Sequence, residues 1–237
     1  MKNIALIIAG GSGQRMHQDI PKQFLNVYDK PVIVYTLEAF QRHPNIDAIE
    51  VVCIEGWEPI LKAYSKQFNI TKLENIVLGG NNGQDSIRNG IYDIASRHDP
   101  EDIVLIHDAI RPMVSEEIIS DCIRVCTKKG NAISVIPCAE AMLRTVDGES
   151  SEAQVPRDNL KRTQTPQAAH LGTLVEAHKE ALAKGITSSV ATCTMFIELG
   201  RKLYFSLGSE KNVKLTTTED IEIFKSLLDS KKAEWLK

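Results

Sequence analysis

The sequence of 237 residues lacks several features that mark particular classes of protein. Acidic and basic residues nearly balance, with a formal net charge of −3, so no basic excess indicates binding to nucleic acid or to an anionic membrane. No apolar run approaches the roughly 20 residues of a membrane span. The first residues begin a strand pattern without the layout of a signal peptide. We therefore expect a cytoplasmic protein with neither nucleic-acid nor membrane partners.

Cysteine is sparse, and its spacing matches no common metal site. The five cysteines are scattered through apolar surroundings, and no Cys-x-x-Cys or His-Glu-x-x-His spacing occurs. Cys122 and Cys126 lie four residues apart on an expected helix, which is not the ligand spacing of a structural zinc site. An odd number of scattered cysteines favours reduced core thiols over a disulfide framework.

Two familiar phosphate-binding templates are also missing from the loop at residues 9–16 (AGGSGQRM). The third glycine of a dinucleotide fingerprint would fall on Met16, and no Gly-Lys-Ser/Thr follows as in a P-loop. Small residues nevertheless let backbone N–H groups approach phosphate oxygens closely. Arg15 and Lys22 supply two cations that can stabilise the charge of phosphoryl or nucleotidyl transfer. The alternative is an ordinary glycine-rich turn with two solvated surface cations.

The hydrophobic pattern predicts one α/β fold with a doubly wound, mostly parallel, Rossmann-like sheet. Short Ile- and Val-rich runs alternate with amphipathic stretches at spacings of roughly 25–30 residues, which is typical of β-α-β crossovers. The expected strands are Ile4–Ile8, Ile49–Ile54, Asn75–Leu78, Ile103–His107 and Ala132–Ile136. The expected helices between them are Val32–Arg42, Pro59–Phe68, Ser86–Ser96 and Glu116–Lys128.

The pattern changes at residues 138–163, which are polar and rich in turn-forming residues. Asp147-Gly148 predicts a hairpin there, and we expect a projecting β-arm on a single domain that spans residues 1–237. A polar hairpin buries little by itself, so we expect a homodimer built through this arm. Beyond it we expect a helix at Leu171–Lys184, a strand at Lys202–Ser206 and a last helix from Thr218 to Leu228, capped by Thr217 or Thr218.

Two further segments follow strands and carry groups suited to ligand binding. Asp108 ends an expected strand, where ligands bind in open α/β sheets, and a carboxylate there suits Mg²⁺. The alternative is a helix-capping aspartate. Residues 79–90 (GGNNGQDSIRNG) form a second small-residue loop, or else an ordinary turn capped by Ser86 or Asp85. Three such loops at three strand ends favour a shared binding site.

Together these motifs resemble the cytidylyltransferases that activate polyol phosphates, the family of the 2-C-methyl-D-erythritol 4-phosphate and ribitol-5-phosphate enzymes. The resemblance spans nearly the whole chain. Six ordered motifs carry it: residues 9–16 (AGGSGQRM), 21–24 (PKQF), 79–86 (GGNNGQDS), 107–112 (HDAIRP), 164–167 (QTPQ) and 212–216 (NVKLT).

The resemblance implies a Rossmann-like nucleotidyltransferase with CTP and a polyol phosphate as substrates and Mg²⁺ as cofactor. Gly80 and Ser86 would read the cytosine, and Asp108 would hold Mg²⁺. The implied CTP-binding residues are Ala9, Gly10, Gly11, Ser12, Gly80, Asn81, Ser86, Asp108 and Ala109.

The same resemblance implies the catalytic cations. Arg15 and Lys22 would stabilise the α-phosphate and the departing pyrophosphate, and Lys214 would also reach the α-phosphate. Arg157 in the arm, together with Arg111, would bind the phosphate of the acceptor, in this family often across a dimer interface. A phosphate monoester is mostly dianionic at neutral pH, so its oxygen can attack the α-phosphorus without a dedicated general base.

Three departures from the family pattern concern the base and the acceptor. Gly83 stands where an arginine is common, and Glu140-Ala141 replaces an Asp-Thr pair. Residues 187–194 (TSSVATCT) contain no carboxylate where the family usually has a Thr-Asp pair. Residues 160–167 (LKRTQTPQ) lack a Gln-Gly typical of ribitol-phosphate enzymes, which favours methylerythritol phosphate as acceptor, with ribitol 5-phosphate as the alternative.

Two other functions remain possible from the sequence. A nicotinamide-dependent oxidoreductase with a degenerate glycine loop is opposed by Met16 and by the cationic pair, which hydride transfer does not need. A non-catalytic nucleotide-binding module is suggested by Gly83 and by the missing acceptor-side carboxylate.

Overall fold

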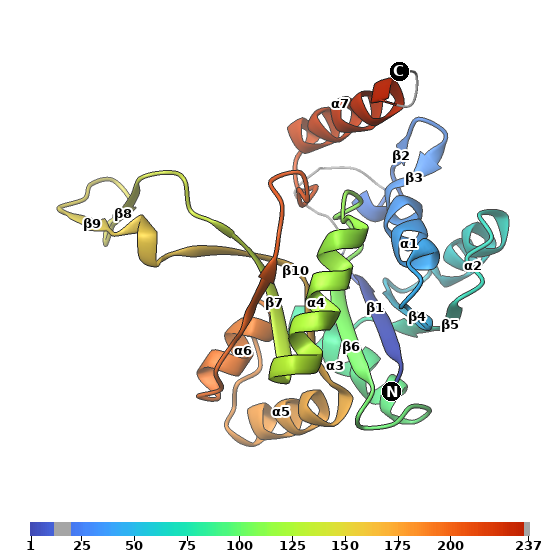
Figure 1. Cartoon of the computed structure of the whole chain (residues 1–237), viewed down its shortest axis with the longest axis horizontal. Helices are drawn as coiled ribbons and strands as arrows, with labels where there is room; N and C mark the ends of the chain where they lie inside the picture. The colour runs from blue at the N-terminus through green and yellow to red at the C-terminus, as the bar shows by residue number, and fades with distance from the viewer. Residues whose placement is uncertain (12–19, 235–237) are drawn as a thin grey trace.

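The computed structural model describes residues 1–11 and 20–234 and is built on one seven-stranded sheet. The strand order is β11-β7-β10-β6-β1-β4-β5 (Figure 1). Neighbouring strands run parallel except around β10, which lies antiparallel to both β6 and β7. In sheet order the strands span Phe205–Leu207, Asn131–Pro137, Lys161–His170, Ile103–Asp108, Asn3–Ala9, Ala48–Cys53 and Leu73–Leu78.

Both faces of the sheet are buried, because side chains of the central strand β1 are apolar on both sides. Ala5 and Ile7 belong to one core cluster, and Ile4 and Leu6 belong to another. The first cluster packs against α1, α2 and α4, and the second packs against α3, α5 and α6. The helices span Val32–Arg42 (α1), Glu58–Gln67 (α2), Gly83–Ala95 (α3), Glu116–Lys129 (α4), Leu171–Ala183 (α5) and Thr192–Glu198 (α6). This layering is the doubly wound α/β fold that the sequence predicts.

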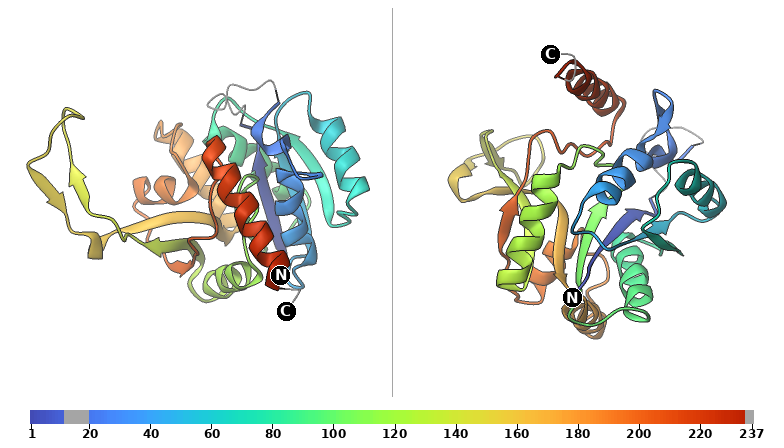
Figure 2. Two further views of the ribbon diagram at one scale, coloured as in Figure 1. Left: turned by 90° about the horizontal axis from the view of Figure 1, so that it is seen from above. Right: turned by 45° about the vertical axis from the view of Figure 1, so that its right-hand side comes forward.

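A long arm leaves the sheet between β7 and β10 and projects far from the rest of the chain (Figures 1 and 2). Its outer part is the hairpin of β8 (Met142–Arg144) and β9 (Ala153–Val155), followed by the 3-10 helix η3 (Arg157–Asn159). Asp147 closes the turn, accepting hydrogen bonds from the backbone N–H groups of Glu149 and Ser150. The β-arm expected at residues 138–163 is therefore present.

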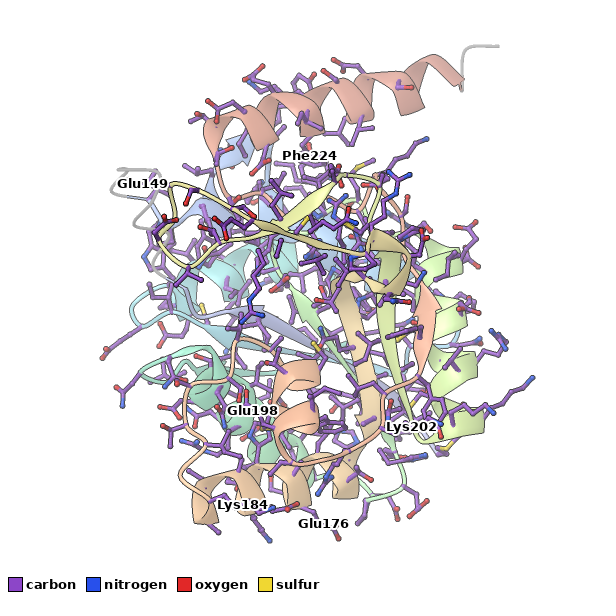
Figure 3. All side chains as sticks on the ribbon, turned by 90° about the vertical axis from the view of Figure 1, so that its left-hand side faces the viewer. Glu149, Glu176, Lys184, Glu198, Lys202 and Phe224 are labelled. Atoms are coloured by element: carbon purple, nitrogen blue, oxygen red, sulfur yellow. The ribbon has the colours of Figure 1, made fainter. Side chains whose placement is uncertain are left out.

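The last helix, α7 (Thr218–Glu234), lies across the end of the molecule near the short strands β2 (Asn26–Val27) and β3 (Lys30–Pro31) (Figure 1). Phe224 of α7 points back toward the body of the chain, where it meets the ring of Tyr35 edge-on (Figure 3). The hydroxyl of Thr217 accepts from the backbone of Asp220, so Thr217 caps this helix as expected. No described helix is long and apolar enough to cross a bilayer.

Most elements lie where the sequence predicts them, and α1 has the predicted bounds. Besides the short elements β2, β3, η2 (Lys22–Phe24) and η3, strand β10 and helix α6 were missed. Strand β10 has a polar sequence, KRTQTPQAAH, and α6 is only two turns long, so neither gives a clear periodic signal. The predicted start of α3 was wrong by three residues, because Asn82 and not Ser86 or Asp85 caps it, its side chain accepting from the backbone of Asp85.

All five cysteines are free and buried, as expected for core thiols. Complete burial raises the pKa of Cys126 to about 12, and Cys53 shows a similar rise to about 12 for the same reason. These thiols are therefore protonated at neutral pH and poorly suited to nucleophilic or metal chemistry.

Helix α3 packs against the sheet so closely that Gly90 admits no side chain. A Cβ atom there would lie 2.6 Å from Leu6 Cδ1 and 2.8 Å from Val52 Cγ2, both fully buried. We predict that Gly90→Ala lowers the free energy of unfolding by about 1–3 kcal/mol, as is usual for overpacking, when measured by urea denaturation. Gly83→Ala is the matched control in the same helix, because its Cβ would meet nothing within 4 Å. Equal stability of the two variants would contradict this packing argument.

Candidate active site

A cleft of about 740 Å³ opens at the carboxyl ends of β1 and β6. It lies where the loops after β1, β5 and β6 meet, which is the usual ligand position in open α/β sheets. The expected site residues that line it are Ala9, Gly10, Gly11, Lys22, Gly80, Asn81, Ser86, Asp108, Arg111 and Lys214. Arg15 and Ser12 fall outside the described residues.

The loop after β1 is held by a buried glutamine. Gln23 follows Lys22 in the 3-10 helix η2 (Lys22–Phe24), and only 2% of its surface is exposed. Its amide donates to the carbonyl of Ala9 at 2.7 Å and to that of Gly11 at 2.9 Å. Both carbonyls are thus turned toward Gln23, which holds residues 9–11 at the end of β1. Gln23 belongs to the motif at residues 21–24, but residue type and spacing alone do not indicate this role.

The glycine loops after β1 and β5 pack backbone against backbone. A Cβ atom on Gly10 would lie 3.4 Å from the Cα of Gly79 and 3.2 Å from Ser86 Oγ. At Gly80 a Cβ atom would lie 2.4 Å from the Cβ of Asp85, which leaves room only for glycine. The Gly10 contacts favour a small residue between the two loops, and the Gly80 contact requires glycine within the loop after β5.

Ser86 organises the loop after β5 from inside the first turn of α3. Its hydroxyl accepts from the backbone N–H of Gly80 at 3.0 Å and donates to the carbonyl of Asn82 at 2.9 Å. The side chain is buried. Ser86 therefore closes the turn that shapes this end of the cleft.

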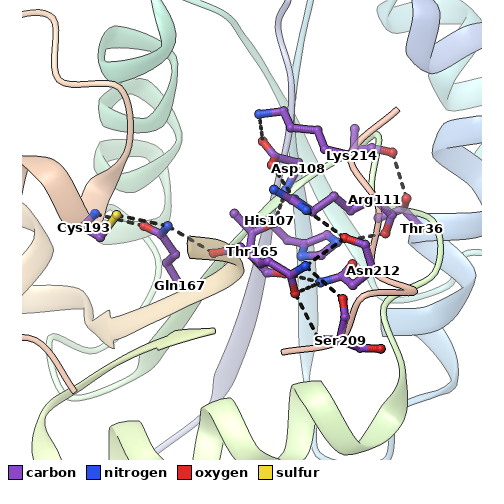
Figure 4. A network of polar contacts seen from close by, with 12 residues as sticks. Thr36, His107, Asp108, Arg111, Thr165, Gln167, Cys193, Ser209, Asn212 and Lys214 are labelled. Carbon is purple, nitrogen blue, oxygen red and sulfur yellow. Dashed lines mark hydrogen bonds and ion pairs between the residues drawn. The ribbon is translucent and has the colours of Figure 1, made fainter. Parts of the chain in front are cut away.

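Asp108, at the end of β6, lies between two cations (Figure 4). Its carboxylate pairs with Lys214 Nζ at 3.2 Å and with Arg111 Nε at 3.0 Å. Burial alone would raise the pKa of Asp108, but the charges of Lys214 and Arg111 outweigh it and lower that pKa. The carboxylate therefore stays ionised at neutral pH.

Arg111 is anchored on both sides. Besides Asp108, its guanidinium donates to the carbonyl of Asn212 at 2.8 Å, and little of the side chain is exposed. His107, the residue before Asp108, is completely buried. This burial lowers its pKa to about 4, so its ring is neutral at pH 7. Its Nε2 lies 3.2 Å from the carbonyl of Arg111. This turn after β6 is thus a rigid platform for Asp108.

Strand β10 joins the walls of the cleft through the motif Gln164-Thr165-Pro166-Gln167 (Figure 4). The Thr165 hydroxyl accepts from the backbone N–H of Asp108, and the Thr165 carbonyl accepts from the amide of Asn212. Gln164 donates to the carbonyl of Ser209 at 2.9 Å, and Gln167 accepts from the backbone of Cys193 at 2.9 Å. The motif was recognised in the sequence, but its role as the connector of these segments was missed.

A second cavity of about 290 Å³ adjoins the cleft on the side of β10. The two cavities share Arg111, Thr163, Gln164 and Lys214, and the second adds Arg162. Arg162 pairs with Glu210 at 3.2 Å and is half exposed. Three basic side chains and two carboxylates, those of Glu210 and Asp220, thus line this space, with a small positive excess.

Two expected site residues lie away from the cleft within this chain. Ala109 is fully buried, and its backbone N–H donates to the carbonyl of Ile8. Arg157 lies in the arm, where it donates to the carbonyl of Ala139 at 2.8 Å. Ala109 therefore supports the strand ends, whereas Arg157 lies on the projecting arm, away from the cleft.

Two of the three departures from the family pattern lie at the cleft. Gly83 lines it, as do Val190, Ala191 and Thr192 from the segment without a carboxylate. Glu140 instead lies in the arm, 4.0 Å from Arg162. The changed segments therefore bear directly on what the cleft binds.

The charges of the cleft suit an anionic ligand with a bound divalent cation. Among the described lining residues, Lys22, Arg111 and Lys214 are basic, and Asp108 carries the one carboxylate. No group of three or more metal-ligating side chains occurs in the described part of the chain. Mg²⁺ is commonly held by one or two carboxylates together with substrate phosphates, so Asp108 fits that mode of binding.

Comparison with known proteins agrees with this geometry. The family model described as 2-C-methyl-D-erythritol 4-phosphate cytidylyltransferase matches residues 3–230. Ribitol-5-phosphate cytidylyltransferase of Lacticaseibacillus paracasei is 42% identical over 96% of this chain and 98% of its own. 2-C-methyl-D-erythritol 4-phosphate cytidylyltransferase of Geotalea uraniireducens is 33% identical over 99% of this chain and 100% of its own.

Solved structures show the same likeness. The crystal structure of a 4-diphosphocytidyl-2C-methyl-D-erythritol synthase matches with a TM-score of 0.79 at 26% identity, covering 96% of this chain and 98% of the other. The family model and the relatives extend over almost the whole chain, including every motif that lines the cleft. The protein therefore belongs to the 2-C-methyl-D-erythritol 4-phosphate cytidylyltransferase family and is a cytidylyltransferase.

Proposed function

We propose that this enzyme transfers CMP from CTP to a small polyol phosphate and releases pyrophosphate. The observation that carries the proposal is the convergence of two glycine loops with Lys22, Asp108 and Lys214 in one cleft. In this proposal backbone groups of Gly10 and Gly11 bind the triphosphate, and the turn closed by Ser86 binds the cytosine, since all three residues line the cleft.

The chemistry follows from these charges. An oxygen of the acceptor's phosphate attacks the α-phosphorus of CTP, the bond to the β-phosphate oxygen breaks, and pyrophosphate leaves. Lys22 and Lys214 stabilise the negative charge that builds up on the phosphates, and Arg15 has the same role in the family pattern. A dianionic phosphate monoester needs no general base, so catalysis rests on positioning and electrostatics.

Mg²⁺ is the proposed cofactor, held by Asp108 together with phosphate oxygens of CTP. When bound, the cation neutralises phosphate charge and orients the triphosphate. Asp108 is ionised and lines the cleft, as this role requires. The ion pair with Arg111 holds the carboxylate of Asp108 in place. Lys214, which pairs with the same carboxylate at 3.2 Å, would be available to the α-phosphate with a cation bound at Asp108.

The acceptor enters from the side of β10. In phosphoryl transfer the attacking and leaving oxygens lie roughly in line. A triphosphate bound at the loop after β1 would therefore leave the β10 side of the cleft for the acceptor. The cavity there is lined by Arg111, Arg162 and Lys214 and by the carboxylates of Glu210 and Asp220, and its remaining positive excess suits the acceptor's phosphate.

The names of the relatives support both candidate acceptors. The relative with 42% identity is named for ribitol 5-phosphate, and one with 33% identity is named for methylerythritol 4-phosphate. The missing Gln-Gly favoured the second acceptor, but the higher identity favours the first. We therefore propose D-ribitol 5-phosphate as the preferred acceptor and 2-C-methyl-D-erythritol 4-phosphate, an isoprenoid precursor, as the alternative.

We also propose a homodimer formed through the arm, in the cytoplasm. Leu143 and Met142 of β8 are exposed, and the arm contacts little else in its own chain. A partner copy would cover these apolar side chains and bring Arg157 to the partner's acceptor site. Five free, buried thiols support a reducing compartment.

An acceptor panel tests the reaction directly. We predict Mg²⁺-dependent pyrophosphate release from CTP with ribitol 5-phosphate, with a higher kcat/KM than with methylerythritol 4-phosphate. The reverse order would restore the preference drawn from the sequence motif. CTP binding without release in the presence of any polyol phosphate would instead favour a non-catalytic nucleotide-binding protein.

Lys214→Ala tests the electrostatic mechanism. We expect kcat to fall by about 100- to 1000-fold, the usual loss for one group that stabilises transition-state charge, with the fold intact by circular dichroism. Lys211→Ala is the matched control, because Lys211 lies exposed on the same segment and does not line the cleft. Similar rates for both variants would remove Lys214 from the mechanism.

Leu143→Glu tests the dimer. Leu143 is 66% exposed on the arm, and a charge there would be buried without a partner in an arm-mediated interface. We predict that sedimentation velocity at micromolar concentration shows a dimer for the wild type and a shift toward monomer for this variant. Ile60→Glu on α2, also at an exposed apolar position, is the control and should remain dimeric. A monomeric wild type would refute the proposed interface.

A further inference from the structure

The loop after β4, residues 54–57, meets the end of β1, although it belongs to none of the sequence motifs of the site. Ile54 donates its backbone N–H to the carbonyl of Ala9 at 3.2 Å, and the amide of Gln23 donates to the same carbonyl at 2.7 Å. The backbone N–H of Trp57 donates to the carbonyl of Ile54 at 3.3 Å. The loop after β4 and the helix η2 are therefore tied to one carbonyl oxygen beside the cleft.

Trp57 extends this link to the other end of η2. Its backbone is fixed where α2 begins, because its carbonyl accepts from the N–H of Leu61 at 2.9 Å. Its ring stacks on the ring of Phe24, with centroids 4.6 Å apart and planes inclined by 23°. Only 3% of Phe24 is exposed, whereas Trp57 is partly exposed. The indole ring thus covers Phe24, the last residue of η2.

The helix η2 is too short to fix its own orientation. It is a single turn of three residues, in which the N–H of Leu25 donates to the carbonyl of Lys22 at 3.2 Å. The two residues after Lys22 attach the turn to its surroundings, Gln23 by hydrogen bonds and Phe24 by its stack on Trp57. Lys22 lines the cleft, so the contacts of its two neighbours decide where its side chain begins.

We propose that Trp57 is a positioning residue, which holds η2 through its stack on Phe24 so that Lys22 meets the charge that develops on the phosphates of CTP. Trp57 itself does not line the cleft. The inference rests on the proposed reaction, in which Lys22 stabilises that charge. Electrostatic stabilisation of a transition state depends on groups that are already in place, so a small displacement of η2 lowers the rate.

Trp57→Ala tests this role, because it removes the stacked ring and leaves the residues of the cleft unchanged. We expect kcat for pyrophosphate release to fall about 10- to 100-fold, as for a small misplacement of a catalytic group. The KM for CTP should change little, because the contact that weakens is one made in the transition state. Trp57→Phe keeps an aromatic ring on Phe24 and should restore most of kcat.

A double-mutant cycle with Lys22→Ala separates positioning from a general loss of packing. Because Trp57 acts through Lys22, Trp57→Ala should lower kcat little further in a protein that already carries Lys22→Ala. Two losses that simply multiply would show that Trp57 acts independently of Lys22, and this result would overturn the assignment.

Tyr64→Ala is the matched control on the same helix. Tyr64 packs against the same core cluster as Trp57, but its ring meets Phe68, at 6.4 Å between centroids. This substitution should lower the Tm and leave kcat unchanged. A wild-type kcat in Trp57→Ala, or an equal loss of kcat in Tyr64→Ala, would overturn the assignment and leave the proposed reaction standing. A wild type that releases no pyrophosphate with any polyol phosphate would overturn both.

Discussion

The ion pairs of Asp108 are the interaction on which the site depends. Lys214 is 106 residues away along the chain, and its pairing brings the loop before α7 over the end of β6. Arg111 fixes the other carboxylate oxygen and reaches Asn212 in that same loop. Two cations close to one carboxylate leave a positive excess at the cleft, which suits a triphosphate and an anionic acceptor.

Buried glutamines hold the other segments of the site in position through hydrogen bonds. Gln23 holds residues 9–11 at the end of β1, and Gln84 holds the segment before α6. Gln164 and Gln167 tie β10 to the segments that contain Ser209 and Cys193. Gln84, Gln164 and Gln167 each donate and accept at once, and Gln23 donates twice, so each side chain ties its own segment to another without adding charge. The cleft keeps its few charges for the ligand because neutral amides do the positioning.

Strand β10 shows most clearly where sequence reasoning fell short. Its antiparallel insertion between β6 and β7 places Thr165 against Asp108 and Gln167 against α6. Lys161, Arg162 and Thr163 at its start are exposed, but from Gln164 onward the strand is polar because its side chains bond to neighbouring backbone. Periodicity methods depend on apolar residues, so a strand that makes such polar contacts gives them no signal. The cap of α3 was misassigned for a related reason, since Asn82, Asp85 and Ser86 are all good capping residues by type.

The sequence by itself determined the alternation of strands and helices, the projecting arm and the family, because apolar periodicity and ordered motifs are local properties of the chain. It also identified Lys22, Asp108 and Lys214, whose chemistry is evident from residue type and motif. Only the tertiary structure decided that Ala109 is buried and that Thr192 lies in the wall of the cleft. Those facts depend on strand order and on contacts between segments far apart in the sequence, which no local pattern records.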